Sequence, residues 1–401
     1  MPRARPNYGW VVVAALAVTE TTSWGVIYYG FGVFLKPLEA DFGWSRLQLT
    51  GAFSVALACQ GVAAVAVGRW LDRASPRLLM TCGSIAATLG TLAWSRTSSL
   101  VGFYLLWAFL GAVMSTVLYD PAFTVVAKWF VGVERRRALT AVTLVAGFAS
   151  TIFLPLEDAL ISRYGWRQAL VILAVILGSV TIPLHALVLR PSPRLEEPPD
   201  VLLPVGHGIE LRELYRTRAF VGLAFALVCF AFAMSALSVH QVAYLIERGY
   251  SPEFAAGVTG VLGAMQVAGR LIFDPLHRWL SRRAVTTLVF GVMAAALVLL
   301  PSGGGTAVVW TFVLVYGAAR GMATLLRATL VADLFGAARY GTISGVLTFL
   351  TTTALASAPV LAGALYDTFG GYQPVLWLIA GVALAGAVAA NRIEAPSRAA
   401  R

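Results

Sequence analysis

The stretch Gly68-Arg-Trp-Leu-Asp72-Arg73-Ala-Ser-Pro-Arg77 is a short charged segment between two apolar runs, at 47–67 and 78–95. Each run has about 20 residues, the length at which an α-helix crosses the hydrocarbon core of a bilayer. We therefore predict that this charged segment joins two membrane-spanning helices.

The composition extends this interpretation to the whole chain. Of the 401 residues, 59% are hydrophobic and 12% are charged, and the mean hydropathy is +0.79. Soluble domains have fractions nearer ~50% and ~25%. The three cysteines fall inside apolar runs and form no CxxC or Cys/His group, so we expect neither a disulfide framework nor a metal site.

Apolar windows bounded by charge, Gly or Pro predict an all-α membrane protein with twelve transmembrane helices in two pseudo-symmetric six-helix bundles. Residues 1–189 form the first bundle, 190–218 a polar linker rich in Pro, Arg and Glu, and 219–401 the second bundle with a short tail. The predicted spans are 10–35, 47–67, 78–95, 99–127, 138–161, 167–189, 219–246, 254–276, 285–301, 306–332, 342–365 and 372–390.

The placement of the cations predicts the orientation. With the N-terminus inside, 21 of the 30 Lys and Arg residues fall on one side of the membrane and 6 on the other. Cytoplasmic loops retain an excess of Lys and Arg. We therefore expect both termini, the linker and the 68–77 segment to be cytoplasmic. The net charge of +11 then gives no reason to expect a nucleic-acid partner.

The two halves repeat weakly. Gly43-Trp44-Ser45 returns as Gly249-Tyr250-Ser251 and Gln60 returns as Gln266, both at an offset of 206 residues. Internal duplication is typical of carriers that alternate access around a site near the membrane midplane.

The 68–77 segment resembles the Gly-x-x-x-Asp-Arg-x-x-x-Arg loop of the major facilitator superfamily, which implies that Gly68, Asp72, Arg73 and Arg77 control conformational change. The matching loop in the second half is degraded, because Asp274 and Arg278 replace the expected Gly and Asp. Any charge latch is therefore expected to differ between the halves.

Three features are similar to the branch of monocarboxylate porters and oxalate/formate antiporters. They are the opening Tyr8-Gly9-Trp10, the run Lys128-Trp129-Phe130 with the Arg135–Arg137 cluster that follows, and Arg270 inside the eighth span. The resemblance implies that Arg270 binds a carboxylate. Gln266 stands where the animal proton-coupled members have an Asp, so their coupling arrangement is not implied here.

Three arginines lie inside predicted spans, where each costs at least ~2.5 kcal/mol unless it has an internal partner or faces water. The fork of Arg270 can hold a carboxylate bidentately, and Gln266 on the same helical face adds a donor. The alternative is an ion pair that stiffens the helix. Arg320, with Tyr316 one turn earlier, is predicted to be either a second anion contact or a structural partner of Glu20. Arg327 is interpreted as structural.

Glu20 and Asp120 are the proton-coupling candidates, because a carboxyl inside a span changes its charge with its surroundings. For Glu20 the alternative is a hydrogen bond between helices. Tyr28, Tyr119 and His240 are candidate cavity residues. Glu157 and Asp158, near the outer end of the fifth span, are interpreted as solvated.

These observations favour a secondary active transporter in the cytoplasmic (inner) membrane that moves a small organic anion, a monocarboxylate by preference, by alternating access. An exporter of a larger amphiphilic, phosphorylated or zwitterionic metabolite is the alternative, and a transport-like sensor is a third. The sequence has no phosphate-binding Gly loop and no nucleophile–base pattern, so we predict no enzymatic activity, no cofactor and no metal. The expected partners are the substrate, the lipid bilayer and a proton or counter-anion, and we expect a monomer.

Overall fold

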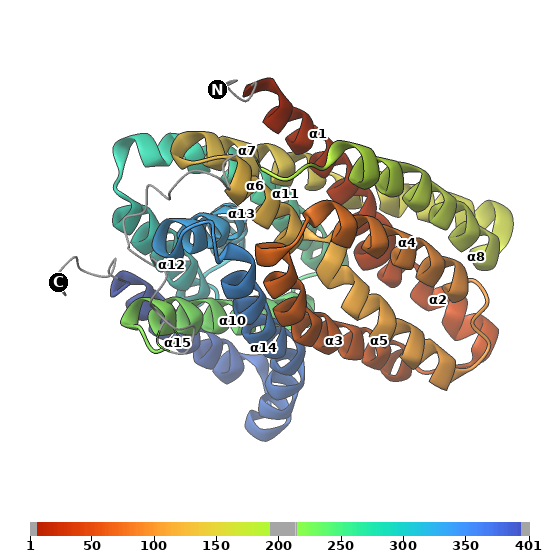
Figure 1. The fold of residues 1–401 in the computed structure, drawn as a ribbon. Helices are drawn as coiled ribbons and strands as arrows, with labels where there is room; N and C mark the ends of the chain where they lie inside the picture. The colour runs from red at the N-terminus through yellow and green to blue at the C-terminus, as the bar shows by residue number, and fades with distance from the viewer. Residues whose placement is uncertain (1–5, 193–212, 214, 394–401) are drawn as a thin grey trace, which may run out of the picture. The chain divides into compact units, whose positions relative to one another are not determined.

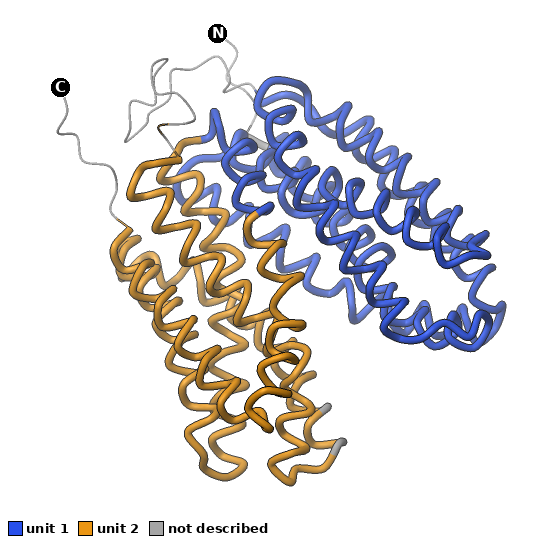
Figure 2. Tube along the Cα trace, turned by 90° about the horizontal axis from the view of Figure 1, so that it is seen from below, with its two compact units in different colours: residues 1–199, 337–349 blue, residues 200–336, 350–401 orange. Residues whose placement is uncertain are grey.

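The computed structural model describes residues 6–192, 213 and 215–393, and all regular structure in these residues is helical (Figure 1). The predicted linker at 190–218 falls mostly outside the described residues. The chain divides into two compact units, residues 1–199 with 337–349 (unit 1) and residues 200–336 with 350–401 (unit 2), coloured separately in Figure 2.

Unit 1 contains the first half of the chain. Its helices are α1 (Pro6–Ser23), the π-helix η1 (Trp24–Tyr29), α2 (Gly30–Phe42), α3 (Arg46–Arg73), α4 (Pro76–Trp94), α5 (Leu100–Val117), α6 (Tyr119–Trp129), α7 (Gly132–Ala146), α8 (Ala149–Pro183) and the π-helix η2 (Leu184–Val188).

Unit 2 contains α10 (Arg218–Glu247), α11 (Pro252–Trp279), α12 (Arg282–Leu299), α13 (Thr306–Phe335) and α15 (Tyr372–Asn391). Between the last two, α14 (Tyr340–Phe369) begins in unit 1 and continues in unit 2 from residue 350. Several of these helices start where the sequence supplies a cap. For example, the hydroxyls of Thr217 and Ser251 accept backbone N–H groups at the starts of α10 and α11.

Ten helical stretches among the described residues are long and apolar enough to cross a membrane. One of them, Gly132–Val188, has 57 residues, which is more than twice the length of one crossing. Gly165, with φ 77° and ψ 159°, breaks this stretch into two helices, and only Gly adopts such a conformation readily. With this break and with the 19-residue α4, each of the twelve predicted spans has its helix. The prediction of an all-α membrane protein is confirmed.

The fourth and fifth predicted spans differ from the helices of the structure. The fourth, 99–127, consists of α5 and α6, which are separated at Leu118 with φ −98° and ψ −165°. Pro121 explains the break, because its ring would clash with the carbonyl four residues earlier in a continuous helix. The fifth, 138–161, begins six residues earlier than predicted, at Gly132. Hydropathy alone misses this start because Glu134 and the Arg135–Arg137 cluster lie inside α7.

Large aromatic side chains form the core of unit 1. Trp94, Trp107, Phe34 and Phe103 are each at most 1% exposed, and the rings of Trp94 and Trp107 meet edge to face with centroids 4.8 Å apart. These residues come from α2, α4 and α5, so the core packs these three helices together. A fixed core of this kind holds the ionisable groups described next in defined positions.

Candidate functional site: buried ionisable groups in each unit

Glu20 lies on α1 and its side chain is fully buried in unit 1. Its Oε2 accepts a hydrogen bond from Nε1 of Trp24, one helical turn later, at 3.0 Å. Asp120, on α6, is close enough to act on Glu20 electrostatically. The two predicted proton-coupling candidates are therefore brought into one neighbourhood, although 100 residues separate them in the sequence.

Trp24 is the centre of an aromatic cluster that includes two predicted cavity residues. Its ring centroid lies 4.7 Å from that of Tyr28 and 4.9 Å from that of Tyr119. Sequence reasoning missed Trp24. The signal was present, because Glu20, Trp24 and Tyr28 follow one another at intervals of four residues and so share a face of the first span. This cluster offers ring faces and hydroxyl groups beside the buried acid.

Asp120 has partners at the start of α14, in the part of that helix that belongs to unit 1. Its Oδ1 accepts a hydrogen bond from the hydroxyl of Ser344 at 3.0 Å, and its Oδ2 accepts one from Thr348 at 2.5 Å. Both donors lie one turn apart on α14, so both point at the same carboxylate. Asp120 thus connects α6 to the first turns of α14.

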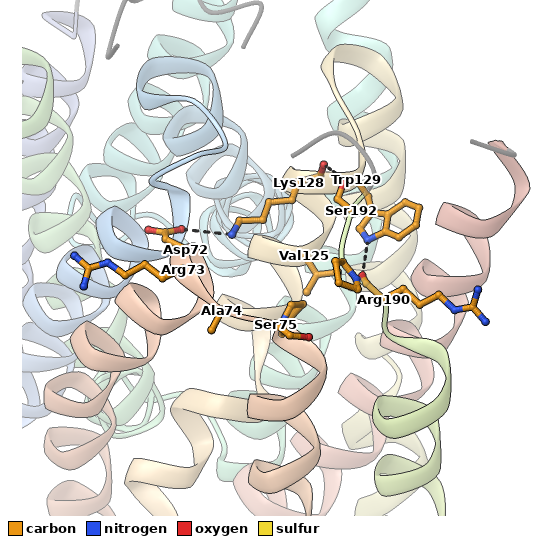
Figure 3. Close-up of a pocket in the computed structure, with 11 residues that line it drawn as sticks. Asp72, Arg73, Ala74, Ser75, Val125, Lys128, Trp129, Arg190 and Ser192 are labelled. Atoms are coloured by element: carbon orange, nitrogen blue, oxygen red, sulfur yellow. Dashed lines mark hydrogen bonds and ion pairs between the residues drawn. The ribbon is translucent and has the colours of Figure 1, made fainter. Parts of the chain in front are cut away.

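The carboxylate of Asp72, from the charged loop, also binds the start of α14. Oδ1 accepts the backbone N–H of Gly341 at 2.9 Å, and Oδ2 accepts that of Thr342 at 2.7 Å. These N–H groups lie in the first turn of a helix, where no intrahelical acceptor exists and the helix dipole favours an anion. Figure 3 shows Asp72 facing Lys128, whose Nζ lies 3.9 Å from Oδ1 and also donates to the carbonyl of Leu71.

Gly68, in the last turns of α3, explains why this end of the helix approaches α14 so closely. A Cβ atom at Gly68 would lie 2.0 Å from the carbonyl oxygen of Gly341, so only Gly allows the two backbones to touch. Arg73 and Arg77 are exposed, and Figure 3 shows Arg73 pointing away from Lys128. Beside Asp72 lies a cavity of about 200 Å³ that Lys128 and Trp129 help to line.

Unit 2 holds the predicted anion-binding residues on two helices, α11 and α13. Arg270, on α11, is 8% exposed, and Gln266 lies one turn before it and is half-buried. On α13, Tyr316 is fully buried and Arg320 is half-buried. The guanidinium of Arg320 donates to the hydroxyl of Ser238, on α10, at 3.4 Å. The sequence did not predict this contact between α13 and α10.

Glycines bring α11 and α13 into backbone contact at the level of these residues. A Cβ at Gly321 would lie 2.0 Å from the carbonyl oxygen of Gln266, and one at Gly269 would lie 1.9 Å from that of Ala318. Such close approach of small residues is a common way for membrane helices to associate. The positions of Gln266 and Arg270 relative to Arg320 therefore depend on the backbone packing of the two helices.

His240, on α10, contacts two other helices of unit 2. Its Nδ1 lies 3.2 Å from the hydroxyl of Tyr372, and its Nε2 lies 3.1 Å from the carbonyl oxygen of Pro359. Both ring nitrogens thus have partners within unit 2, on α14 and α15. The imidazole ring therefore joins α10 to both of these helices. The interpretation of Glu157 as solvated is wrong, because its side chain is fully buried, whereas Asp158 beside it is exposed.

Long apolar helices with buried ionisable side chains inside each unit define a multi-pass membrane protein. The chain belongs to the Major Facilitator Superfamily, whose family model matches residues 14–359. This membership confirms the family resemblance that the 68–77 loop indicated.

Curated relatives cover most of the chain. Monocarboxylate transporter 13 of Bos taurus is 26% identical over an aligned region that covers 96% of this chain and 89% of the relative. Monocarboxylate transporter 12 of Mus musculus is 24% identical over an aligned region that covers 94% of this chain and 83% of the relative.

Solved structures share the fold. An outward conformation of FucP, a Major Facilitator Superfamily transporter, matches with a TM-score of 0.75 at 15% identity and covers 96% of this chain and 99% of that structure. The human organic anion transporter MFSD10 matches with a TM-score of 0.72 at 14% identity, covering 97% and 100%. At these identities the likeness concerns the fold alone.

Proposed function

We propose that this protein is a secondary active transporter for a small organic anion, and that its cargo is a monocarboxylate. The observation that carries the proposal is the buried Arg270 with Gln266 one turn away, packed against the helix that carries Arg320. A guanidinium in an apolar span needs an anionic or polar counterpart, and a carboxylate matches its fork. The names of the curated relatives support the same class of cargo.

Tyr316, Tyr119, Tyr28 and His240 complete the proposed set of cargo-facing residues, with Glu20 and Asp120 as sites for a coupling proton. Transport would proceed by alternating access between bundles formed by residues 1–189 and 219–401. In this scheme the contacts of Asp72 and Asp120 with the start of α14 stabilise one state and are released in the other. The protein would act as a monomer in the inner membrane with both termini in the cytoplasm.

Substitution of Arg270 tests the proposal. Arg270→Lys keeps the charge but loses the fork, and Arg270→Ala loses both. A hydrogen bond to a charged group contributes about 1.5–3 kcal/mol, so each lost contact should weaken cargo binding by roughly 10- to 150-fold. Uptake of labelled monocarboxylates into proteoliposomes measures the effect. Arg163→Lys is the matched control, because Arg163 is exposed and lies beside Tyr164 at a helix end. Normal uptake by both Arg270 variants would exclude the assigned anion site.

The second candidate is an exporter of a larger amphiphilic metabolite. The cluster of Trp24, Tyr28 and Tyr119 favours it, because stacked rings suit a cargo with an extended apolar face. Thermal stabilisation of the purified protein across a panel of short carboxylic acids and larger amphiphiles separates the two candidates. A ligand raises the midpoint only when it binds the folded state. Stabilisation by the larger compounds alone would favour the exporter.

A further inference from the structure

Glu157 is a buried acid for which the proposed transport scheme has no use. It lies on α8, its side chain is 0% exposed, and among the described residues neither carboxyl oxygen has a hydrogen-bond partner. Asp158, the next residue, is exposed. An exposed carboxylate keeps its hydration when it is ionised. A buried carboxylate that has neither a hydrogen-bond donor nor a cation beside it loses that hydration, which costs several kcal/mol of free energy.

The carboxyl group lies against the π-helical turn in the first span. A Cβ at Gly30 would lie 2.6 Å from Oε1 of Glu157, and a Cβ at Gly25 would lie 2.3 Å from the ring of Phe153, one turn earlier on α8. Glycine at both positions therefore makes room for the two side chains. π-Helical turns inside longer helices are frequent at functional sites. Here the carboxyl group of Glu157 packs against the end of the π-helical turn, at Gly30.

A backbone carbonyl of the same turn lies in the neighbourhood of the Glu157 carboxyl group. The carbonyl oxygen of Gly25 lies 3.4 Å from the position where a Cβ of Gly30 would stand, on which Oε1 of Glu157 also borders. This carbonyl accepts the N–H of Gly30, and a carbonyl has a second lone pair. A carboxylic acid has an O–H donor that suits a neighbourhood of carbonyl acceptors, whereas a carboxylate offers only acceptors.

Among the described residues, the structure gives the carboxyl group of Glu157 no hydrogen bond and no ion pair. Glu20 is bonded to Trp24, Glu39 to Arg46, Asp41 to Arg167, and His185 to Ser84 and Thr19. The ionisable side chains on the elements packed against α8 are Tyr8, Glu20, Tyr28, Tyr29, Lys36, Glu39, Asp41, Arg77, Cys82 and His185, and on α8 itself Asp158, Arg163, Tyr164 and Arg167.

We propose that Glu157 is a proton-binding site, distinct from Glu20, which holds a proton while it is buried against η1 and releases it to water when α8 and η1 separate. On release, the O–H bond of the carboxyl breaks, its electron pair stays on Glu157 as carboxylate, and the proton passes to water. There it forms a new O–H bond with a lone pair of the water oxygen, which gives hydronium, and no other bond changes. The role of this site in transport rests on the proposed function, whereas the binding of the proton does not.

Infrared difference spectroscopy of the full chain in lipid vesicles tests the site without any cargo. A protonated carboxylic acid has a carbonyl band separate from the carboxylate bands. At neutral pH we expect the wild-type protein and Asp158→Asn to show this band, and Glu157→Gln to lose part of it. Glu157→Asp should shift the frequency of this carbonyl band. The shift assigns the band to residue 157 even where the Gln variant does not fold. Spectra of Glu157→Gln and Glu157→Asp that both match the wild type would overturn the proposal.

Transport measurements then test the role of the site. With a cargo identified in proteoliposomes, Glu157→Gln should keep exchange of cargo at equal pH on both sides but lose acceleration of uptake by a pH gradient. If Glu157→Gln takes up cargo at the wild-type rate under a pH gradient, then Glu157 does not couple transport to the proton. Absence of uptake of every acid tested by the wild-type protein would count against the proposed function, and the infrared result would still decide whether Glu157 binds a proton.

Discussion

The backbone contact between α11 and α13 makes Gly321→Ala a sharp test of the cargo site. The added Cβ would lie 2.0 Å from the carbonyl oxygen of Gln266, 2.7 Å from its carbonyl carbon and 2.8 Å from its Cα. All three are backbone atoms, so no side-chain rotation relieves the clash. Ordinary contacts begin at 3.4 Å, so the two helices must move apart by the difference from 2.0 Å, about 1.4 Å.

The cost of this movement follows from overpacking. Inserting a methyl group into a well-packed interior typically costs about 1–3 kcal/mol. For a unit of this size, that corresponds to a fall in the thermal midpoint of roughly 2–12 °C. Because Gln266 and Arg270 move with α11, uptake should fall more than the amount of folded protein does. A displacement of about 1 Å is large for groups that must meet a bound ligand in a defined geometry.

Thermal unfolding of purified protein and uptake by proteoliposomes together measure the effect. Gly291→Ala is the matched control, because it also adds a methyl group inside a helix of unit 2, but nothing lies within 4 Å of the new atom. We expect Gly291→Ala to unfold at or above the wild-type temperature, since Ala favours helix more than Gly does. If Gly321→Ala matches this control in both measurements, then the close packing of α11 and α13 is not what positions Arg270.

Two further predictions concern the start of α14. Asp72→Asn replaces a carboxylate that accepts two backbone N–H groups with a neutral amide, which should weaken its hold on α14 by about 1.4 kcal/mol or more. Thr342 is 5% exposed, so a Cys introduced there reports the opening of this contact. In the Asp72→Asn background this Cys should react with a water-soluble maleimide at least tenfold faster. The experiment uses protein without Cys59, Cys82 and Cys229, and an unchanged rate would show that Asp72 does not hold α14. Thr348→Val removes one donor to Asp120 at constant shape and should lower stability by about 1–3 kcal/mol, whereas Thr368→Val, which alters an exposed residue, should not. Equal thermal midpoints for the two Val variants would refute this reading of Asp120.

The sequence by itself determined the class of the molecule. Insertion of a helix into a bilayer depends on the summed hydropathy of about 20 consecutive residues and on the charges that flank them. Both quantities are local, so the twelve spans follow from the composition and length of the apolar stretches. The loop from Gly68 to Arg77 indicated the family from a few residues. Gly and Pro also marked breaks, although the interruption at Leu118 was visible only as Pro121 three residues later.

Only the tertiary structure decided which groups meet. Residues that lie 200 or more positions apart form the contacts of Asp72 and Asp120 with α14, and no local pattern specifies such a pairing. The sequence also does not show which of two neighbouring acids on α8 is buried. Glu157 is buried against Gly30, whereas Asp158, the next residue, is exposed. Whether a charged residue faces water or a helix depends on the rotation of its helix within the bundle, and long-range packing sets that rotation.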